Sequence, residues 1–313
     1  APEPVGLAST PIDVPTASPP PMSISTSVST SHVQEDLTNF DPSGLLAQEC
    51  ELMPWEQMGS DIIGKSPRDW TGDTVSLSRN GGHLAVSSPS SDLGGKNAGA
   101  VTVYKFNSQL NKWVQIGDTI VGEAVEDWSG REAVALSADG QYVVIGASRN
   151  EGGGPDTAGH VRVFAYFAPA DYWYQVGADI DGEAPIDLSG VSVAISDSGS
   201  RIAVGAHLND GNGTDAGHVR VWEFDGSGWV QVGVDIDGES RYGYFGIDVD
   251  LSADGNVLCV GAHAHDGLAL NSGQAQYVCE SSVQDIKHNR RKSYELSYGH
   301  QTEGDPLKYR LTL

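Results

Sequence analysis

Carboxylates spaced for cation binding occur twice along the chain, in two loops of the form Asp-x-Asp-Gly-Glu. Alternate carboxylates around a tight glycine turn can converge on one ion, and oxygen ligands of this kind suit Ca²⁺. We therefore predict weak Ca²⁺ binding by these loops and by an acidic loop near them. Asp and Gly also make good turns and solvate loops, so a purely structural role is the alternative. The predicted ligands are Asp179, Asp181, Glu183, Asp210, Asp215, Asp235, Asp237 and Glu239.

Two tryptophans in similar loops could bind a partner by stacking. Trp70 and Trp128 occupy a repeated position that Leu188 and Tyr244 fill elsewhere. An exposed indole ring offers a platform for a sugar or a peptide, so we predict that both rings bind a partner. Packing beneath the loop is the alternative. By contrast, His160 and His218 recur with Arg162 and Arg220 and are predicted to be ordinary strand positions.

The elements that would position these residues come from an internal repeat. A Trp-x-Gln-x-Gly segment opens each copy, and successive copies start 58, 60 and 56 residues apart, at Trp55, Trp113, Trp173 and Trp229. Each copy contains Val- and Ile-rich runs separated by Gly and Asp turns, a pattern that favours short antiparallel strands. Four such strands per repeat are typical of a β-propeller blade.

The repeat predicts an all-β fold, a β-propeller of four four-stranded antiparallel blades over residues 53–283. The array begins with what resembles a fourth strand, 55–59, and ends after a third, 274–279. We expect the first segment to complete the last blade and close the ring; an incomplete or open ring is the alternative. Residues 1–52, rich in Pro, Ser and Thr, are predicted to be disordered, and the basic residues 284–313 to form a poorly ordered tail.

Strand alternation predicts one strongly acidic face. The loops between second and third strands, and those leading into the next copy, emerge on the same side of the blades. Most Asp and Glu side chains of residues 55–283 fall in these loops. The hairpins on the opposite side carry one carboxylate each, too few for the six to eight oxygens of a calcium site, and are predicted to be structural turns.

A pair of glycine elements in each copy resembles a known family. A Gly before the first strand is followed 15 or 16 residues later by Gly-Ala, as in Gly130 with Gly146-Ala147 and Gly190 with Gly205-Ala206. This pattern resembles the FG-GAP repeats, which form the blades of integrin α-subunit propellers. The resemblance covers residues 55–283 and implies an extracellular or cell-surface protein. The family's longer calcium loop is absent from the hairpins, and its integrin members have seven blades rather than four.

The composition of the chain limits which kinds of partner and environment we expect. The formal net charge of −24 repels phosphate backbones, so we expect no nucleic-acid partner. No stretch approaches the ~20 apolar residues of a transmembrane helix. Three cysteines are too few for a disulfide scaffold; Cys259 and Cys279 are predicted on neighbouring strands, either as a disulfide or as two buried thiols.

No serine–histidine–aspartate order, phosphate loop or zinc motif is present in the sequence. We therefore predict a non-enzymatic recognition or adhesion module that binds a protein or glycan through the acidic face, with or without Ca²⁺. One alternative is a carbohydrate-active hydrolase that uses paired loop carboxylates. The other alternative is a structural wall or matrix protein.

Overall fold

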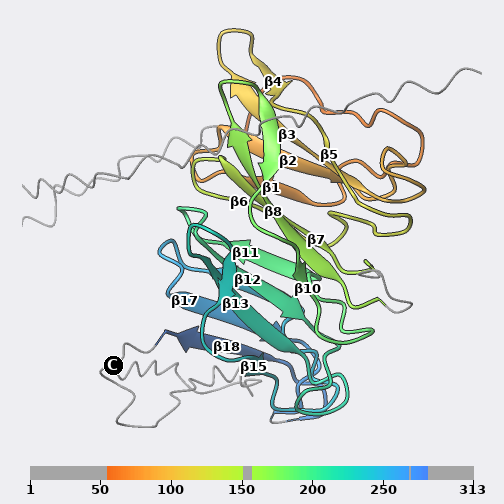
Figure 1. Cartoon of the computed structure of the whole chain (residues 1–313), viewed down its shortest axis with the longest axis vertical. Coiled ribbons are helices and arrows are strands. Elements are labelled where there is room, and N and C mark those ends of the chain that lie inside the picture. Colours follow the sequence, from red (N-terminus) through yellow and green to blue (C-terminus); the bar gives the residue numbers. More distant parts are fainter. Residues whose placement is uncertain (1–54, 151–156, 268, 281–313) are drawn as a thin grey trace, which may run out of the picture. The chain divides into compact units, whose positions relative to one another are not determined.

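The computed structural model describes residues 55–150, 157–267 and 269–280 (Figure 1). The predicted disordered segment, 1–52, and the predicted basic tail, 284–313, both lie outside these residues. The chain divides into two units, 1–55 and 56–313, and the strands belong to the second. No helix occurs in the described part, so the predicted all-β class is confirmed.

The strands form four antiparallel sheets in chain order (Figure 1). The first contains β1 (Val75–Leu77), β2 (His83–Ser88), β3 (Ala100–Asn107), β4 (Lys112–Gln115) and β5 (Ile120–Val121). The second contains β6 (Val134–Leu136), β7 (Tyr142–Ala147), β8 (His160–Phe167), β9 (Tyr172–Gln175) and β10 (Ile180–Asp181). The third contains β11 (Ser192–Ile195), β12 (Arg201–Ala206), β13 (His218–Phe224), β14 (Trp229–Gln231) and β15 (Ile236–Asp237). The fourth contains β16 (Asp248–Leu251), β17 (Val257–Ala262) and β18 (Gln274–Cys279).

Neighbouring sheets pack face to face, as propeller blades do. The central strands β7 and β12 are buried along almost their whole length, because a sheet covers each side of them. Their runs of Val, Ile and small residues suit such double burial. The innermost strands β1, β6, β11 and β16 contact one another in that order. One apolar cluster fills each interface between successive sheets, with Val101 and Ile145 in the first, Val161 and Ile202 in the second, and Phe245 in the third.

The recurring glycines permit the closest approach between sheets. A Cβ atom on Gly146 would lie 2.0 Å from the carbonyl oxygen of Gly190 in the next sheet, so no larger residue fits there without a shift. The recurring tryptophans also bridge sheets. The Nε1–H groups of Trp173 and Trp229 donate to the backbone carbonyls of Ile116 (3.0 Å) and Val176 (2.7 Å) in the preceding repeat. Both features explain why these residues recur along the chain.

The details of strand number and closure differ from the prediction. The first three sheets each gain a two-residue strand, β5, β10 or β15, which pairs with the third strand. Among the described residues the fourth sheet has three strands, and residues 55–59 form none. Trp113 donates its Nε1–H to the carbonyl oxygen of Met58 (3.0 Å), the same bond that Trp173 and Trp229 make to the preceding repeat. The expected closing strand is thus not found among the described residues, although its segment keeps the contact to the first sheet.

The short hairpins between first and second strands are structural turns. Asp139 accepts hydrogen bonds from the Ser137 hydroxyl (2.7 Å) and the backbone amide of Gln141 (2.9 Å), and Asp254 makes the corresponding pair of bonds in the fourth sheet. Their carboxylates are engaged in holding their own turns, as the sequence indicates.

Candidate functional site

The same position beside the third strand can be compared in successive sheets. In the second and third sheets, buried side chains fill it. In the second sheet, β8 places His160 and Arg162 there, both nearly inaccessible to solvent. Arg162 donates to the carbonyl oxygen of Val121 (2.8 Å), and its Nη1 lies 3.3 Å from the Glu123 carboxylate. The third sheet repeats the arrangement on β13, where the corresponding residues are His218, Arg220, Asp181 and Glu183.

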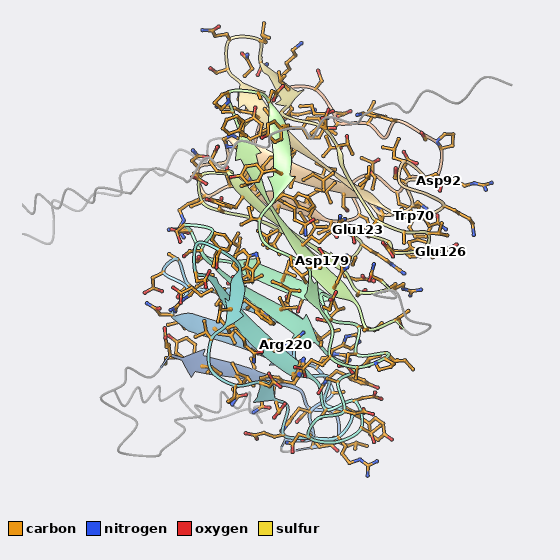
Figure 2. All side chains as sticks on the ribbon, viewed as in Figure 1. Trp70, Asp92, Glu123, Glu126, Asp179 and Arg220 are labelled. Carbon is orange, nitrogen blue, oxygen red and sulfur yellow. The ribbon has the colours of Figure 1, made fainter. Side chains whose placement is uncertain are left out.

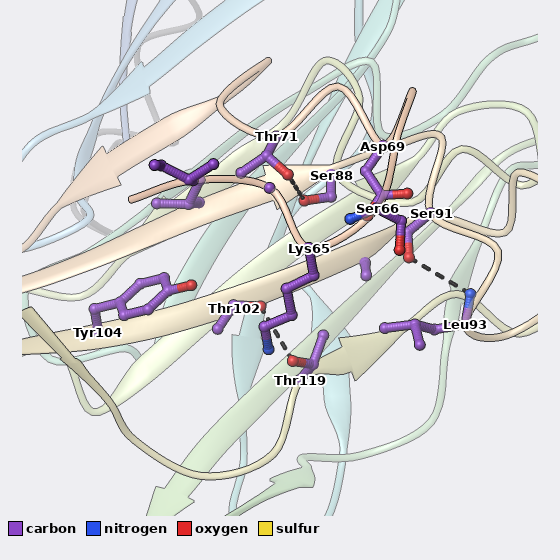
Figure 3. A pocket seen from close by; sticks show the side chains of 14 residues that line it. Lys65, Ser66, Asp69, Thr71, Ser88, Ser91, Leu93, Thr102, Tyr104 and Thr119 are labelled. Atoms are coloured by element: carbon purple, nitrogen blue, oxygen red, sulfur yellow. Dashed lines mark hydrogen bonds between the residues drawn. The ribbon is translucent and has the colours of Figure 1, made fainter. Parts of the chain in front are cut away.

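The first sheet leaves the same space partly empty. The positions of the histidine and arginine hold Ala100 and Thr102 on β3, and Lys65 stands where the other copies have glutamate. A cavity of about 60 Å³ results, and hydroxyl groups line much of it (Figure 3). Thr102 and Thr119 are hydrogen-bonded within it (3.1 Å), and Lys65 donates to Gln115 (3.2 Å). This polar cavity (the hydroxyl pocket) therefore exists because the first copy departs from the repeat.

A larger groove adjoins the hydroxyl pocket. Its volume is about 650 Å³, and Trp70 and Trp128 line it together with the loop after β2. The two indole rings are 5.5 Å apart between centroids and tilted by 43°. Trp70 is 53% exposed, so its ring is available to a ligand. The hydroxyl pocket and this groove (the tryptophan groove) share four lining residues, Ser66, Asp69, Ser91 and Leu93.

The tryptophans are held by a strained loop conformation. Trp70 and Trp128 have φ angles of 55° and 53°, in the left-handed region that bulky residues rarely adopt. Each loop is tied by the preceding aspartate: Asp69 accepts from the Ser66 amide (3.1 Å) and Asp127 from the Ala124 amide (2.7 Å). Leu188 and Tyr244, at the same position of the other copies, have φ angles of 53° and 55°, so this conformation belongs to the repeat. In the first two copies it places one indole ring beside the other.

Two carboxylates line the tryptophan groove. Asp69 uses Oδ2 for its loop hydrogen bond, and Asp92 uses Oδ1 to accept from the Asn97 amide (2.8 Å). The other oxygen of each has no hydrogen-bond partner among the described residues. Neither residue was among the predicted site residues. One signal in the sequence could have indicated them. They lie in the first copy, where a loop tryptophan, Trp70, occurs together with Ala100 and Thr102 in place of the histidine and arginine.

An ion pair lies beside the groove. Lys96, a groove residue, is 2.6 Å from Glu126, whose second oxygen accepts from the Trp128 Nε1–H (3.1 Å). The hydrogen bond from Lys96 is the main cause that lowers the pKa of Glu126, which stays ionised. Arg131 lies over the Trp128 ring, 5.0 Å from its centroid. Cations thus offset the acidic groups around the groove.

The eight predicted cation ligands do not form one site. Asp179 lies with Glu123 and His160, whereas Glu183 and Asp235 lie with His218 in the next repeat. The Asp210 carboxylate accepts from the Asp215 amide (2.8 Å) and so closes its own loop. The remaining three are exposed side chains at or next to the two-residue strands: Asp181, Asp237 and Glu239. Each Asp-x-Asp-Gly-Glu loop therefore divides its carboxylates instead of focusing them on one ion.

The other sequence predictions have simple outcomes. Cys259 and Cys279 are free and exposed, so they are neither a disulfide nor two buried thiols. Within the described residues no helix has the length and apolar character needed to span a membrane.

No family model matches the chain, and no curated protein does. Among solved structures, it resembles a "putative 6-phosphogluconolactonase" from Bacteroides uniformis, with 10% identity and a TM-score of 0.39 over 72% of this chain and 71% of the other. A second protein of that description, from Bacteroides fragilis, has 12% identity and a TM-score of 0.42 over 71% of this chain and 56% of the other.

These neighbours correct one prediction. Both are described as enzymes, which contradicts the prediction of a non-enzymatic adhesion module. At this level of similarity they assign no reaction, substrate or residue role to this chain. What the chain does has to be argued from its own site.

Proposed function

We propose that this protein is a hydrolase that cleaves a neutral glycan bound in the tryptophan groove, with Asp69 and Asp92 as the reacting carboxylates. The observation that carries the proposal is their placement together in one groove beside two adjacent, partly exposed indole rings. Apolar faces of sugar rings pack on indole rings, while carboxylates and hydroxyl groups bind their polar edges.

The groove suits an uncharged substrate. Its lining combines Arg68 and Lys96 with Asp69 and Asp92, so positive and negative groups balance there. The formal charge of the whole chain is −24, which disfavours the approach of phosphorylated or acidic sugars. The adjoining hydroxyl pocket offers Thr71, Ser88 and other hydroxyl groups to a small polar substituent of the sugar (Figure 3).

Glycoside hydrolysis needs two carboxyl groups in different protonation states. One donates a proton to the leaving glycosidic oxygen as the bond from C1 to that oxygen breaks, and the other activates water or attacks C1, so that water is added across the bond. Asp69 and Asp92 are each anchored through one oxygen and keep the other open, which fixes their direction without blocking it. We assign the proton donor and the base or nucleophile to Asp69 and Asp92 as a pair, and do not say which residue has which role.

The proposal also keeps two predictions from the sequence. The repeat is FG-GAP-like, since Gly146 and Gly205 make the close inter-sheet contacts for which a glycine is required. The protein acts outside the cell or on its surface, where glycan polymers are accessible. A fractionation experiment that finds the native protein only in the cytosol would contradict this location.

Turnover of a panel of neutral oligosaccharides and chromogenic glycosides tests the activity. We expect hydrolysis of at least one substrate, with kcat lowered about 100-fold or more in Asp69→Asn and in Asp92→Asn. Trp70→Ala should chiefly raise KM, because it removes a binding surface and no reacting group. Absence of turnover across the panel, or full activity in both Asn variants, would overturn the proposal.

The repeat supplies matched controls for both substitutions. Asp210 closes its loop by accepting from Asp215, as Asp92 does from Asn97, and Asp187 accepts from the Ala184 amide, as Asp69 does from Ser66. Asp210→Asn and Asp187→Asn therefore disturb the same loop hydrogen bonds away from the groove. We expect both control variants to keep wild-type kcat.

A further inference from the structure

Two clusters related by the repeat each combine a buried histidine with two carboxylates. In the first, Glu123, His160 and Asp179 bring one possible ligand atom each within 4.8 Å of the others. In the second, Glu183, His218 and Asp235 do the same. Figure 2 labels Glu123 and Asp179 of the first cluster and Arg220 beside the second. The proposed hydrolysis uses neither cluster.

The carboxylates of the first cluster are oriented by hydrogen bonds that leave one oxygen open. Asp179 accepts from Gln175 through Oδ1 (2.6 Å), and Glu123 faces Arg162 through Oε1 (3.3 Å). Bonds of this type to the second oxygen are what orients carboxylate ligands in metal sites. The guanidinium group thus holds the glutamate and leaves Oε2 free.

The second cluster repeats these bonds. Asp235 accepts from Gln231 through Oδ1 (2.7 Å), and Glu183 accepts from Arg220 through Oε1 (3.3 Å). Two copies with the same geometry show that the arrangement belongs to the repeat and is no accident of one loop.

The histidines are buried and suited to ligation. His160 is 2% exposed and His218 is 1% exposed. The Nε2 atom of His160 has no hydrogen-bond partner among the described residues, an unusual state for a buried nitrogen. Burial first, and then the adjacent arginine, lowers the pKa of each histidine, so both rings are neutral and keep a lone pair at pH 7.

We propose that each cluster binds one first-row divalent cation of the Zn²⁺ type, giving two equivalents per chain. Imidazole nitrogen with carboxylate oxygen is a donor set for Zn²⁺ and its neighbours, whereas Ca²⁺ takes oxygen alone. Three protein ligands leave a fourth position for water. Ligand atoms around such an ion lie roughly 3.4 Å apart, so a small adjustment of the exposed side chains would complete the coordination from the present separations of up to 4.8 Å.

The proposal assigns the acids of one motif to different ions. Asp179 belongs to the first ion, Glu183 to the second, and Asp181 to neither. The first sheet cannot form a third site of this kind, because Lys65, Ala100 and Thr119 occupy the ligand positions.

Titration of the metal-free full chain with Co²⁺, followed by its visible absorption, and with Zn²⁺, followed by calorimetry, tests the proposal. We expect two equivalents for the wild type, one for His160→Ala and one for His218→Ala, and none above background for the double variant. Asp179→Asn and Glu183→Gln, which alter accessible side chains and keep the fold testable, should each remove one different equivalent. Asp181→Asn should retain both.

Several results would overturn the proposal. These are no specific binding by the wild type, binding of Ca²⁺ without Co²⁺, or two equivalents retained in the double histidine variant. Loss of both equivalents in Asp179→Asn would also contradict it, because that carboxylate would then serve both ions. Circular dichroism of each variant separates loss of a ligand from loss of the fold.

Discussion

The same place beside the third strand is closed in the second and third sheets and open in the first. In the closed copies an arginine and a histidine fill it. The arginine bonds to the last strand of the preceding sheet through a backbone carbonyl, and to the glutamate that follows this strand. In the open copy, alanine and threonine leave the hydroxyl pocket, which leads into the tryptophan groove. A few substitutions in the shared repeat therefore separate a packed interface from an open pocket.

This contrast shows where to look for function in a repeat array. Residues that recur among the copies, such as the glycines and the outer-strand tryptophans, hold sheets together. In the first copy the smaller Ala100 and Thr102 replace the histidine and arginine, and the space that results can take a ligand. The departure from the pattern is thus more informative about activity than the pattern is.

The largest expected effect is on stability, at an inter-sheet contact where the copies have different residues. Gly146 of the second sheet corresponds to Ser87 of the first. Because a Cβ on Gly146 would lie 2.0 Å from the Gly190 carbonyl oxygen, Gly146→Ser should lower the free energy of unfolding by about 3 kcal/mol or more. The reverse change, Ser87→Gly, loses the hydrogen bond from the Thr74 amide (2.9 Å) and should cost about 1–2 kcal/mol.

Urea denaturation followed by tryptophan fluorescence measures both variants. A Gly146→Ser protein within 1 kcal/mol of the wild type would mean that the second and third sheets do not approach as closely as described.

A smaller effect, on activity, is expected when the open copy is given the residues of a closed one. The triple substitution Lys65→Glu, Ala100→His and Thr102→Arg should fill the hydroxyl pocket and lower kcat/KM for the glycan about 100-fold, or about 2.7 kcal/mol. Its thermal unfolding should stay near that of the wild type, because the new groups find the partners that the other copies use. This test rests on the proposed hydrolysis.

The matching control opens a closed copy. His218→Ala with Arg220→Thr should create a cavity in the third sheet and leave turnover unchanged, since that sheet has no paired tryptophans beside it. Equal turnover in the triple variant and the wild type would show that the hydroxyl pocket takes no part in substrate binding.

The sequence predicts the sheets well because the repeat records them four times. Trp173 and Trp229 mark inter-sheet hydrogen bonds, and Gly146 marks a close contact between sheets, so both signals reflect packing between neighbouring sheets. Ring closure could not be inferred in this way. The segment that contains Met58 has the sequence of an outer strand, but its neighbour is set by tertiary packing.

The candidate site was harder to predict, for two physical reasons. A pocket depends on side chains that are missing, and the signal was the change from His-x-Arg to Ala100-x-Thr102 between copies. Spacing along a chain also does not show toward which sheet a side chain points. Asp179 and Glu183 are four residues apart, yet they face different histidines in successive repeats.

The smallest expected effect is a loss of stability in acid around Tyr244. This residue occupies, in the last copy of the repeat, the loop position that Trp70 and Trp128 occupy in the first two. Tyr244 lies 5.9 Å from His207 and stacks on His263 at 5.2 Å between ring centroids, so the last interface carries titratable rings where the groove has indoles. Burial, with a smaller contribution from His263, lowers the pKa of His207 to about 4. The copies should therefore differ in their response to acid.

The sign of that response follows from proton uptake. In the unfolded chain His207 has its ordinary pKa of about 6.5, so between pH 6.5 and about 4 the unfolded state binds a proton that the folded state does not. Stability is complete above pH 6.5 and falls as the pH approaches 4. Allowing for solvent screening at this partly exposed side chain, the loss is about 1–2 kcal/mol. Urea unfolding of the metal-free protein at pH 7, 5.5 and 4.5 should show a shallower decline for His207→Gln than for the wild type. Parallel declines would place the acid sensitivity elsewhere in the fold.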